Sequence, residues 1–264
     1  MVSGIEKFKE YFAEYDSHYI IIGGTACDIL EENAGQQPRA TKDIDIILIV
    51  EALTAAFVKR FWDFVKAGEY ETRQHGNGKN EYFRFLKPQA VNFPAQIEIF
   101  ARKPDILDIP DEARLTPIPI DEDLSSLSAI LMNDDYYNFT LEHSSVEDNV
   151  HLANIESLIC MKAKAFNDLS KRKSKGEKVD SKDVVKHKND IFRLSTMLGE
   201  SDIFVIPDEL KMDLAIFCED MLVALPDKKW FKDVGLGNVE PKDVWDGLCK
   251  SFSIEWEDEN TVRL

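Results

Sequence analysis

Two aspartates, Asp43 and Asp45, alternate with isoleucines in the run RATKDIDIILIV at residues 39–50. Alternate side chains of a β-strand point to the same face, so both carboxylates are expected on one face while Ile44 and Ile46 pack on the other. Neighbouring carboxylates repel each other, and Mg²⁺, which prefers oxygen ligands, removes that repulsion. The run predicts a magnesium site, although an acidic strand end that faces water has the same pattern.

A third acid, Glu98, lies between Ile97 and Ile99 in the run AQIEIFARK. A single acid on an apolar strand indicates either a functional site or a neighbouring cation. Two alternatives therefore stay open. Glu98 joins the two aspartates as a metal ligand or as a general base for an attacking hydroxyl, or it forms a cross-strand ion pair with Arg84.

The stretch IIGGTACDIL at residues 21–30 turns from an apolar strand into a helix through Gly23 and Gly24. The first backbone N–H groups of a helix have no partner inside the helix and can bind an anion, and Thr25 adds a hydroxyl donor. The alternative is that the glycines permit a tight turn and Thr25 caps the helix. No P-loop lysine follows, so the stretch is not a Walker motif.

Apolar periodicity predicts an α/β half followed by an all-helical half. Helices are expected at 4–15, 24–33 and 52–66, and strands at 18–23, 43–50, 81–86 and 95–101. Strand-like pieces follow at 114–120 (RLTPIPI) and 136–143 (YYNFTLEH), and HGNGKN at 75–80 is expected to connect a hairpin. From about Ile155 onward, helices are expected within 155–169, 181–198, 207–225 and 241–252, before a solvated tail. The prediction is an α+β fold with domains at 1–150 and 151–264.

The composition narrows the class of protein. The chain has 264 residues and four cysteines, none in a CxxC pair, so neither a disulfide framework nor a structural zinc site is expected. No apolar run approaches the roughly 20 residues that span a bilayer, and the polar start MVSGIEKFKE does not resemble a signal peptide. We therefore expect a cytoplasmic protein with no membrane partner.

The charge of the chain is unevenly distributed. The formal net charge is −17, which argues against a general nucleic-acid coat protein, but residues 162–188 hold ten basic and four acidic residues, a net charge of +6. Phosphate contacts need local positive charge. The candidate RNA-binding residues are Lys171, Arg172, Lys173 and Lys175. The alternative is a solvated, partly disordered loop.

These motifs together resemble a known superfamily. The GGTA corner, the following helix, the RATKDIDI strand and the isolated later acid resemble the nucleotidyltransferases of the DNA polymerase beta-like fold. The runs LICMKAKAF and KHKNDIFRL resemble AbiEii/AbiGii-type nucleotidyltransferases, many of which are toxins of toxin–antitoxin or phage-defence pairs. The resemblance covers about residues 18–195. It implies a nucleotidyltransferase head with a short mixed β-sheet flanked by helices, and a C-terminal helical bundle.

The resemblance also implies roles for individual residues. Gly23, Gly24 and Thr25 would hold the triphosphate, and Asp43 and Asp45 would bind the metal. The sequence departs from the superfamily pattern at Glu98, where members often have aspartate. This departure bears on whether Glu98 acts as the general base.

In the helical half, the resemblance implies that Lys162 contacts the nucleotide phosphates and that Asp190 belongs to the same pocket. Lys162→Ala is then expected to weaken triphosphate binding more than folding. The alternative is that Lys162 and Asp190 form a surface ion pair, which would contribute under about 1 kcal/mol.

The expected reaction is magnesium-dependent transfer of a nucleoside monophosphate from a nucleoside triphosphate to a hydroxyl, with Asp43, Asp45 and Glu98 holding up to two Mg²⁺ ions. The favoured acceptor is an RNA end, tRNA in particular. A cognate antitoxin protein is the partner that the toxin interpretation implies. The alternatives are a small-molecule acceptor such as an antibiotic, a protein acceptor, and a catalytically silent nucleotide-binding module.

Overall fold

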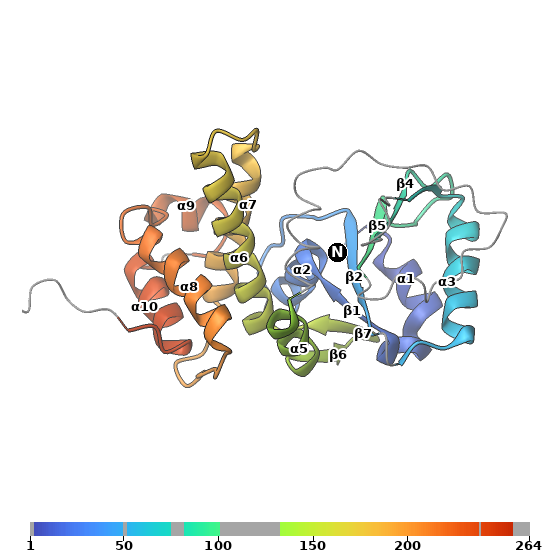
Figure 1. Cartoon of the computed structure of the whole chain (residues 1–264), viewed down its shortest axis with the longest axis horizontal. Helices are drawn as coiled ribbons and strands as arrows, with labels where there is room; N and C mark the ends of the chain where they lie inside the picture. The colour runs from blue at the N-terminus through green and yellow to red at the C-terminus, as the bar shows by residue number, and fades with distance from the viewer. Residues whose placement is uncertain (1–2, 50–51, 75–81, 101–132, 238, 256–264) are drawn as a thin grey trace, which may run out of the picture. The chain divides into compact units, whose positions relative to one another are not determined.

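The computed structural model describes residues 3–49, 52–74, 82–100, 133–237 and 239–255. The chain divides into two compact units, Met1–Met161 and Lys162–Leu264, and the division falls inside helix α6 (Ile155–Ser174). The first unit holds a mixed sheet with helices, and the described part of the second is helical (Figure 1). The predicted α+β class is confirmed. In the part of the chain that the structure describes, no helix is both long and apolar enough to cross a membrane.

A seven-stranded sheet organises the described part of the first unit, in the order β3-β4-β5-β2-β1-β7-β6. The pairs β2–β5 and β1–β7 are parallel, and the other neighbours are antiparallel. The strands are β1 (Tyr19–Ile22), β2 (Asp43–Leu48), β3 (Glu71–Gln74), β4 (Tyr82–Leu86), β5 (Gln96–Phe100), β6 (Ser144–Glu147) and β7 (Val150–Ala153).

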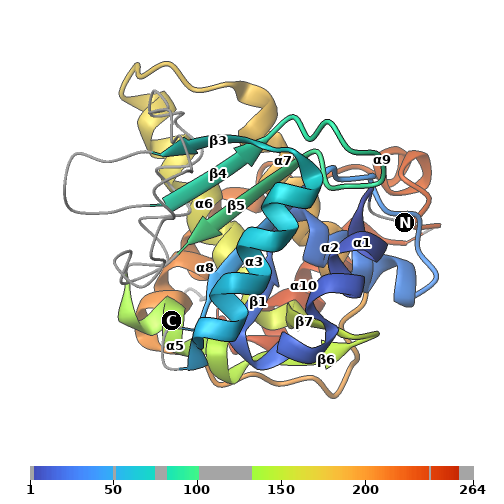
Figure 2. The ribbon, with the colours of Figure 1, turned by 90° about the vertical axis from the view of Figure 1, so that its right-hand side faces the viewer.

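The helices of the first unit lie on both faces of this sheet, with α1 and α3 on one face and α2 on the other (Figures 1 and 2). The rings of Phe8 and Tyr19 meet edge to face at 5.3 Å, and those of Phe61 and Phe85 at 5.4 Å, so α1 and α3 cover the apolar face. Among the described residues of the first unit, the helices are α1 (Ile5–Phe12), the 3₁₀ helix η1 (Ala13–His18), α2 (Gly23–Asn33), α3 (Ala55–Gly68) and α5 (Asp134–Glu142).

One sequence-based expectation is wrong: the run YYNFTLEH forms helix α5 instead of a strand. The Asn133 side chain accepts hydrogen bonds from the backbone N–H groups of Asp135, at 2.9 Å, and Tyr136, at 3.3 Å, which caps the helix. Acids in the first turn add favourable charge. Capping therefore outweighs the strand preference of Tyr, Phe and Thr. RLTPIPI, HGNGKN and the tail from 256 onward lie outside the described residues.

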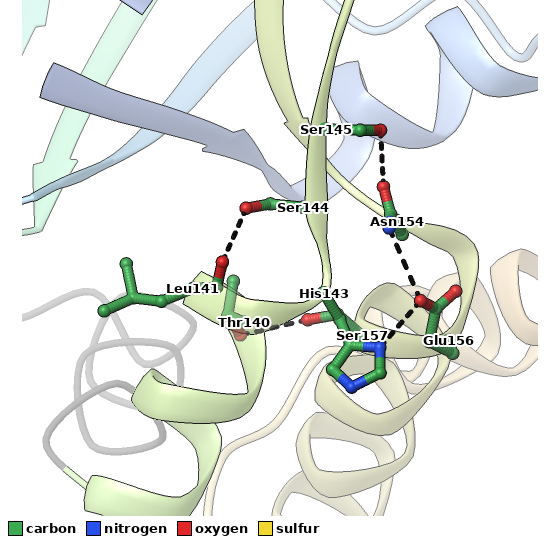
Figure 3. A network of polar contacts seen from close by, with 8 residues as sticks. All are labelled: Thr140, Leu141, His143, Ser144, Ser145, Asn154, Glu156 and Ser157. Atoms are coloured by element: carbon green, nitrogen blue, oxygen red, sulfur yellow. Dashed lines mark hydrogen bonds and ion pairs between the residues drawn. The ribbon is translucent and has the colours of Figure 1, made fainter. Parts of the chain in front are cut away.

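A polar network joins α5, β6, Asn154 after β7, and the start of α6 (Figure 3). His143 Nδ1 lies 2.9 Å from Glu156 Oε1, and the Ser145 hydroxyl donates to Asn154 Oδ1 at 2.7 Å. These contacts fix the residues that lead into α6. The β6–β7 hairpin was not predicted. Its turn residues Asp148 and Asn149 both have positive φ, at 48° and 63°, as tight hairpin turns require.

The second unit confirms the helices expected after residue 155. They are the C-terminal part of α6, α7 (Ser181–Ser195), α8 (Asp208–Met221), α9 (Lys228–Asp233), which was not predicted, and α10 (Pro241–Ser251). Ring contacts between Phe166 and Phe217, at 5.2 Å, and between Phe192 and Phe231, at 6.2 Å, lie in its core. The basic segment is ordered over much of its length, because α6 continues to Ser174.

Candidate functional site

The strand register gathers the three acids on one face of the sheet. Asp45 lies opposite Ile22 on β1 and opposite Glu98 on β5, and Glu98 in turn lies opposite Arg84 on β4. Asp43 is two residues before Asp45, so its side chain shares that face. Asp45 lies next to Gly23 at the start of α2, so this row of acids is on the face of the sheet that α2 covers.

The glycine corner adjoins this row directly. Gly23 begins α2 with φ of +70°, and a Cβ placed on it would lie 2.0 Å from Asp45 Oδ2. The absence of a side chain therefore lets the Asp45 carboxylate approach the start of α2. The positive end of a helix dipole favours a negative group at this position.

We predict that Gly23→Ala weakens magnesium-dependent nucleotide binding, because the new methyl group displaces the Asp45 carboxylate. Gly35→Ala is the matched control. Gly35 has φ of +74°, but a Cβ there has nothing within 4 Å, so it adds only the backbone strain of about 1 kcal/mol. Chemical denaturation and nucleotide titration of both variants measure the two effects. Equal losses in the two variants would contradict the proposed contact.

Glu98 is buried, with 7% of its surface exposed, and pairs with Arg84. Its Oε1 lies 2.6 Å from Arg84 Nε and accepts a hydrogen bond from Gln96 Nε2 at 2.6 Å. The cross-strand ion pair that the sequence leaves open as an alternative is present. The pKa of Glu98 is raised to about 8, first by burial and then by the charge of Asp45, while Arg84 opposes both effects. The raised pKa shifts Glu98 towards its protonated form, whereas the contact with Arg84 favours the ionised form.

This raised pKa predicts a pH-dependent stability. Between the ordinary pKa of 4.5 and about 8, the folded chain keeps the Glu98 proton while the unfolded chain releases it. The stability that Glu98 contributes is present below pH 4.5 and is lost as the pH rises through 8. Relative to Glu98→Gln, wild type should lose a few kcal/mol across this window, by denaturant titration. Parallel stability curves for the two proteins would contradict the raised pKa.

The donor atoms fit a magnesium ion held by two aspartates. Among the residues that the structure describes, no three His, Cys, Asp or Glu side chains are arranged to hold a metal. Mg²⁺ does not need such a cage, since it commonly takes one or two carboxylates and completes its shell with water and substrate phosphates. Asp43 and Asp45 can supply those carboxylates. Burial is the largest cause of the raised Glu98 pKa, but the charges of Asp45 and Asp43 also raise it, and a cation would relieve that repulsion.

Thr25 lies at the corner, but its hydroxyl points inward. The residue is fully buried, and its hydroxyl donates to the Asp43 carbonyl. The hydroxyl therefore ties α2 to β2 at the first metal-candidate residue. The sequence-based interpretation expects this hydroxyl to donate to a phosphate, but the hydroxyl does not point outward. Only the backbone N–H of Thr25 is then left to contact a phosphate.

In the second unit, Lys162 on α6 and Asp190 on α7 form a buried ion pair. Lys162 Nζ lies 2.6 Å from Asp190 Oδ2, and the two residues are 5% and 1% exposed. The surface-pair alternative is therefore wrong. An ammonium group has three N–H donors, so the bond to Asp190 does not use up its capacity to bind phosphate.

The four candidate RNA-binding residues lie at the end of α6 and just beyond it. Lys171, Arg172 and Lys173 belong to the last turn of the helix, and Lys175 follows it. Arg172 Nε lies 2.8 Å from Glu177 Oε2, and Lys173 Nζ donates to the Ser181 hydroxyl at 2.8 Å. These contacts hold the basic residues at the junction between α6 and α7.

Comparisons with known proteins give a likeness in structure but none in sequence. No protein-family model matches the chain, and no curated protein matches it. A solved structure that is similar to the chain is that of an antigenic nucleotidyltransferase-like protein from Paracoccidioides brasiliensis. The match has 14% sequence identity and a TM-score of 0.42, and covers 92% of this chain and 97% of that chain.

Proposed function

We propose that the chain is a magnesium-dependent nucleotidyltransferase, which moves a nucleoside monophosphate from a nucleoside triphosphate to a hydroxyl. One observation supports this most strongly: the Asp45 carboxylate meets the start of α2 at Gly23 and lies opposite Glu98 on the next strand. A helix N-terminus that binds anions thus adjoins carboxylates that suit Mg²⁺.

Each residue has a role in the proposed reaction. Asp43 and Asp45 would hold Mg²⁺, which when bound neutralises phosphate charge and lowers the pKa of the attacking hydroxyl. The backbone N–H groups that begin α2, at Gly24 and Thr25, receive phosphate oxygens. Glu98, oriented by Arg84, accepts the proton of the hydroxyl when it is itself deprotonated.

The hydroxyl oxygen forms a bond to the α-phosphorus, while the bond from that phosphorus to the bridging oxygen breaks and pyrophosphate leaves with the electron pair. Lys162, oriented by Asp190, is proposed to contact the phosphates as a point charge. Pyrophosphate release from each of ATP, GTP, CTP and UTP, with and without total RNA, tests the reaction. No release and no binding of any triphosphate would contradict it.

The proposed acceptor is an RNA end, with tRNA favoured, because the junction between α6 and α7 gathers positive charge in an otherwise acidic chain. The residues that support this are Lys171, Arg172, Lys173 and Lys175. A small-molecule hydroxyl or a protein side chain is the alternative acceptor. A toxin role, with an antitoxin partner, is proposed from the sequence resemblance alone. Growth arrest on induced expression, absent in an Asp45→Asn strain, tests it.

We predict that changing these four basic residues together to glutamine weakens RNA labelling and flattens its dependence on salt. A protein that neutralises fewer phosphates releases fewer counterions, so the dependence of RNA affinity on salt becomes shallower. Binding of the triphosphate alone should stay nearly unchanged. Filter binding and gel labelling across a salt series measure both effects. Unaltered labelling and salt slope would remove the RNA assignment and favour a small-molecule acceptor.

A further inference from the structure

The loop between α2 and β2 places the Arg39 guanidinium next to the first turn of α2. A Cβ added to Gly24 would lie 2.6 Å from Arg39 Nη2 and 2.8 Å from Thr41 Oγ1. The preceding residue, Gly23, is the one that adjoins Asp45. The Arg39 guanidinium and the Asp45 carboxylate therefore meet consecutive residues of the same corner. The sequence alone leaves open whether Arg39 and Thr41 orient Asp43 or only close the loop.

A buried acid holds this loop in place. Asp28 lies four residues after Gly24 and so on the same face of α2. It is 1% exposed, and its Oδ2 accepts a hydrogen bond from the Thr41 backbone N–H at 2.5 Å. Between Arg39 and Thr41, Ala40 has φ of +63°, which residues other than glycine rarely adopt. The Asp28 contact thus anchors the loop directly after its unusual turn.

Two side-chain oxygens at this place lack a partner. Asp28 Oδ1 and Thr41 Oγ1 are buried and form no hydrogen bond within the described structure. Buried polar atoms are nearly always hydrogen-bonded, so an unsatisfied hydroxyl beside Gly24 indicates a place where a further group binds. A phosphate oxygen is a strong acceptor for a hydroxyl, for an arginine and for the N–H groups that begin a helix.

We propose that Arg39 and Thr41 bind the phosphates of the nucleoside triphosphate over the start of α2, and that Asp28 is a positioning residue that holds them there. The inference rests on the proposed function and deepens it. Arg39 is exposed, so its guanidinium can reach a ligand from solvent. Its planar fork of N–H groups matches two phosphate oxygens at once. It also supplies positive charge at the corner where the Asp45 carboxylate would otherwise repel the triphosphate.

Arg39→Gln tests the binding role on an exposed side chain. By calorimetry with Mg²⁺, the affinity for ATP, GTP, CTP or UTP, and for inorganic tripolyphosphate, should fall at least about tenfold, and Arg39→Lys should recover part of it. Lys42→Gln is the matched control, because it removes an equal charge from an exposed residue of the same loop and should change affinity less than about twofold. Wild-type affinity in Arg39→Gln would overturn the proposal.

The positioning role of Asp28 is tested by asking which second changes restore tripolyphosphate binding. Asp28→Ala should weaken tripolyphosphate binding as Arg39→Gln does, whereas Asp28→Asn keeps an acceptor for the Thr41 N–H and should bind nearly as wild type. Adding Ala40→Gly to Asp28→Ala should restore part of the affinity, since glycine adopts positive φ readily. A purely structural acid would lower the melting temperature without this rescue, and that result would overturn the positioning role. If wild type binds no triphosphate or tripolyphosphate, the proposed function itself fails, and this inference with it.

Discussion

Replacing Asp45 by asparagine is expected to lower the rate of nucleotide transfer at least about a hundredfold. The change keeps the shape of the side chain, so its contact with Gly23 and the fold should survive. It removes the charge that would hold Mg²⁺ beside the phosphates. If that interaction contributes about 3 kcal/mol to the barrier, the rate falls by roughly a hundredfold. Pyrophosphate release at saturating triphosphate measures the effect.

The same variant has a readout that does not depend on activity. The negative charge of Asp45 is the second-largest cause of the raised Glu98 pKa, so Asp45→Asn should move the pH dependence of stability to lower pH. Added Mg²⁺ should also stabilise wild type more than the variant. Asp135→Asn, an exposed acid of the first unit, is the control for the loss of charge. A folded Asp45→Asn protein with most of its activity would exclude the metal assignment.

The alternation of the DIDI run was enough to place Asp43 and Asp45 on one face, because the side-chain period of a strand is fixed. The sequence did not decide whether Glu98 pairs with Arg84 or joins the aspartates. The register between the strands places Glu98 opposite Asp45 on one side and opposite Arg84 on the other. Register depends on pairing between strands that are far apart in the sequence. The contact between Gly23 and Asp45 likewise follows from the pairing of β1 with β2.

Other features were missed because local interactions decided them. Helix α5 depends on the Asn133 cap, and strands β6 and β7 on a turn with two left-handed residues. The sequence-based interpretation assigns no role to Asp28. The signal that could have found it is its place four residues after Gly24, between the apolar residues Cys27 and Ile29 of α2. An acid on a buried helix face needs a partner, and this one meets the loop that precedes the aspartates.

The spacing of Lys162 from the apolar residues of its helix also indicates that it is buried. Lys162 lies four residues after Leu158 and seven before Leu169, both fully buried, so it belongs to the packed face of α6. The sequence-based expectation that Lys162→Ala affects triphosphate binding more than folding therefore needs revision. A lysine 5% exposed and paired with an aspartate 1% exposed is part of the core of the second unit.

We accordingly predict that Lys162→Met lowers the free energy of unfolding by about 3–5 kcal/mol, because it leaves the Asp190 charge buried without its partner. The double variant Lys162→Met/Asp190→Leu should recover most of this loss, since apolar groups of similar volume can replace a buried pair. Lys59→Met is the matched control: its pair with Asp63 has the same 2.6 Å separation, but the side chains are 77% and 45% exposed. Its loss should stay below about 1 kcal/mol.

Denaturant titrations of all three variants show whether burial of the pair, or the distance between its charges, causes the loss of stability. If the double variant is no more stable than Lys162→Met, the pair acts through packing rather than charge. If the double variant folds and still binds the triphosphate as wild type does, Lys162 has no phosphate role.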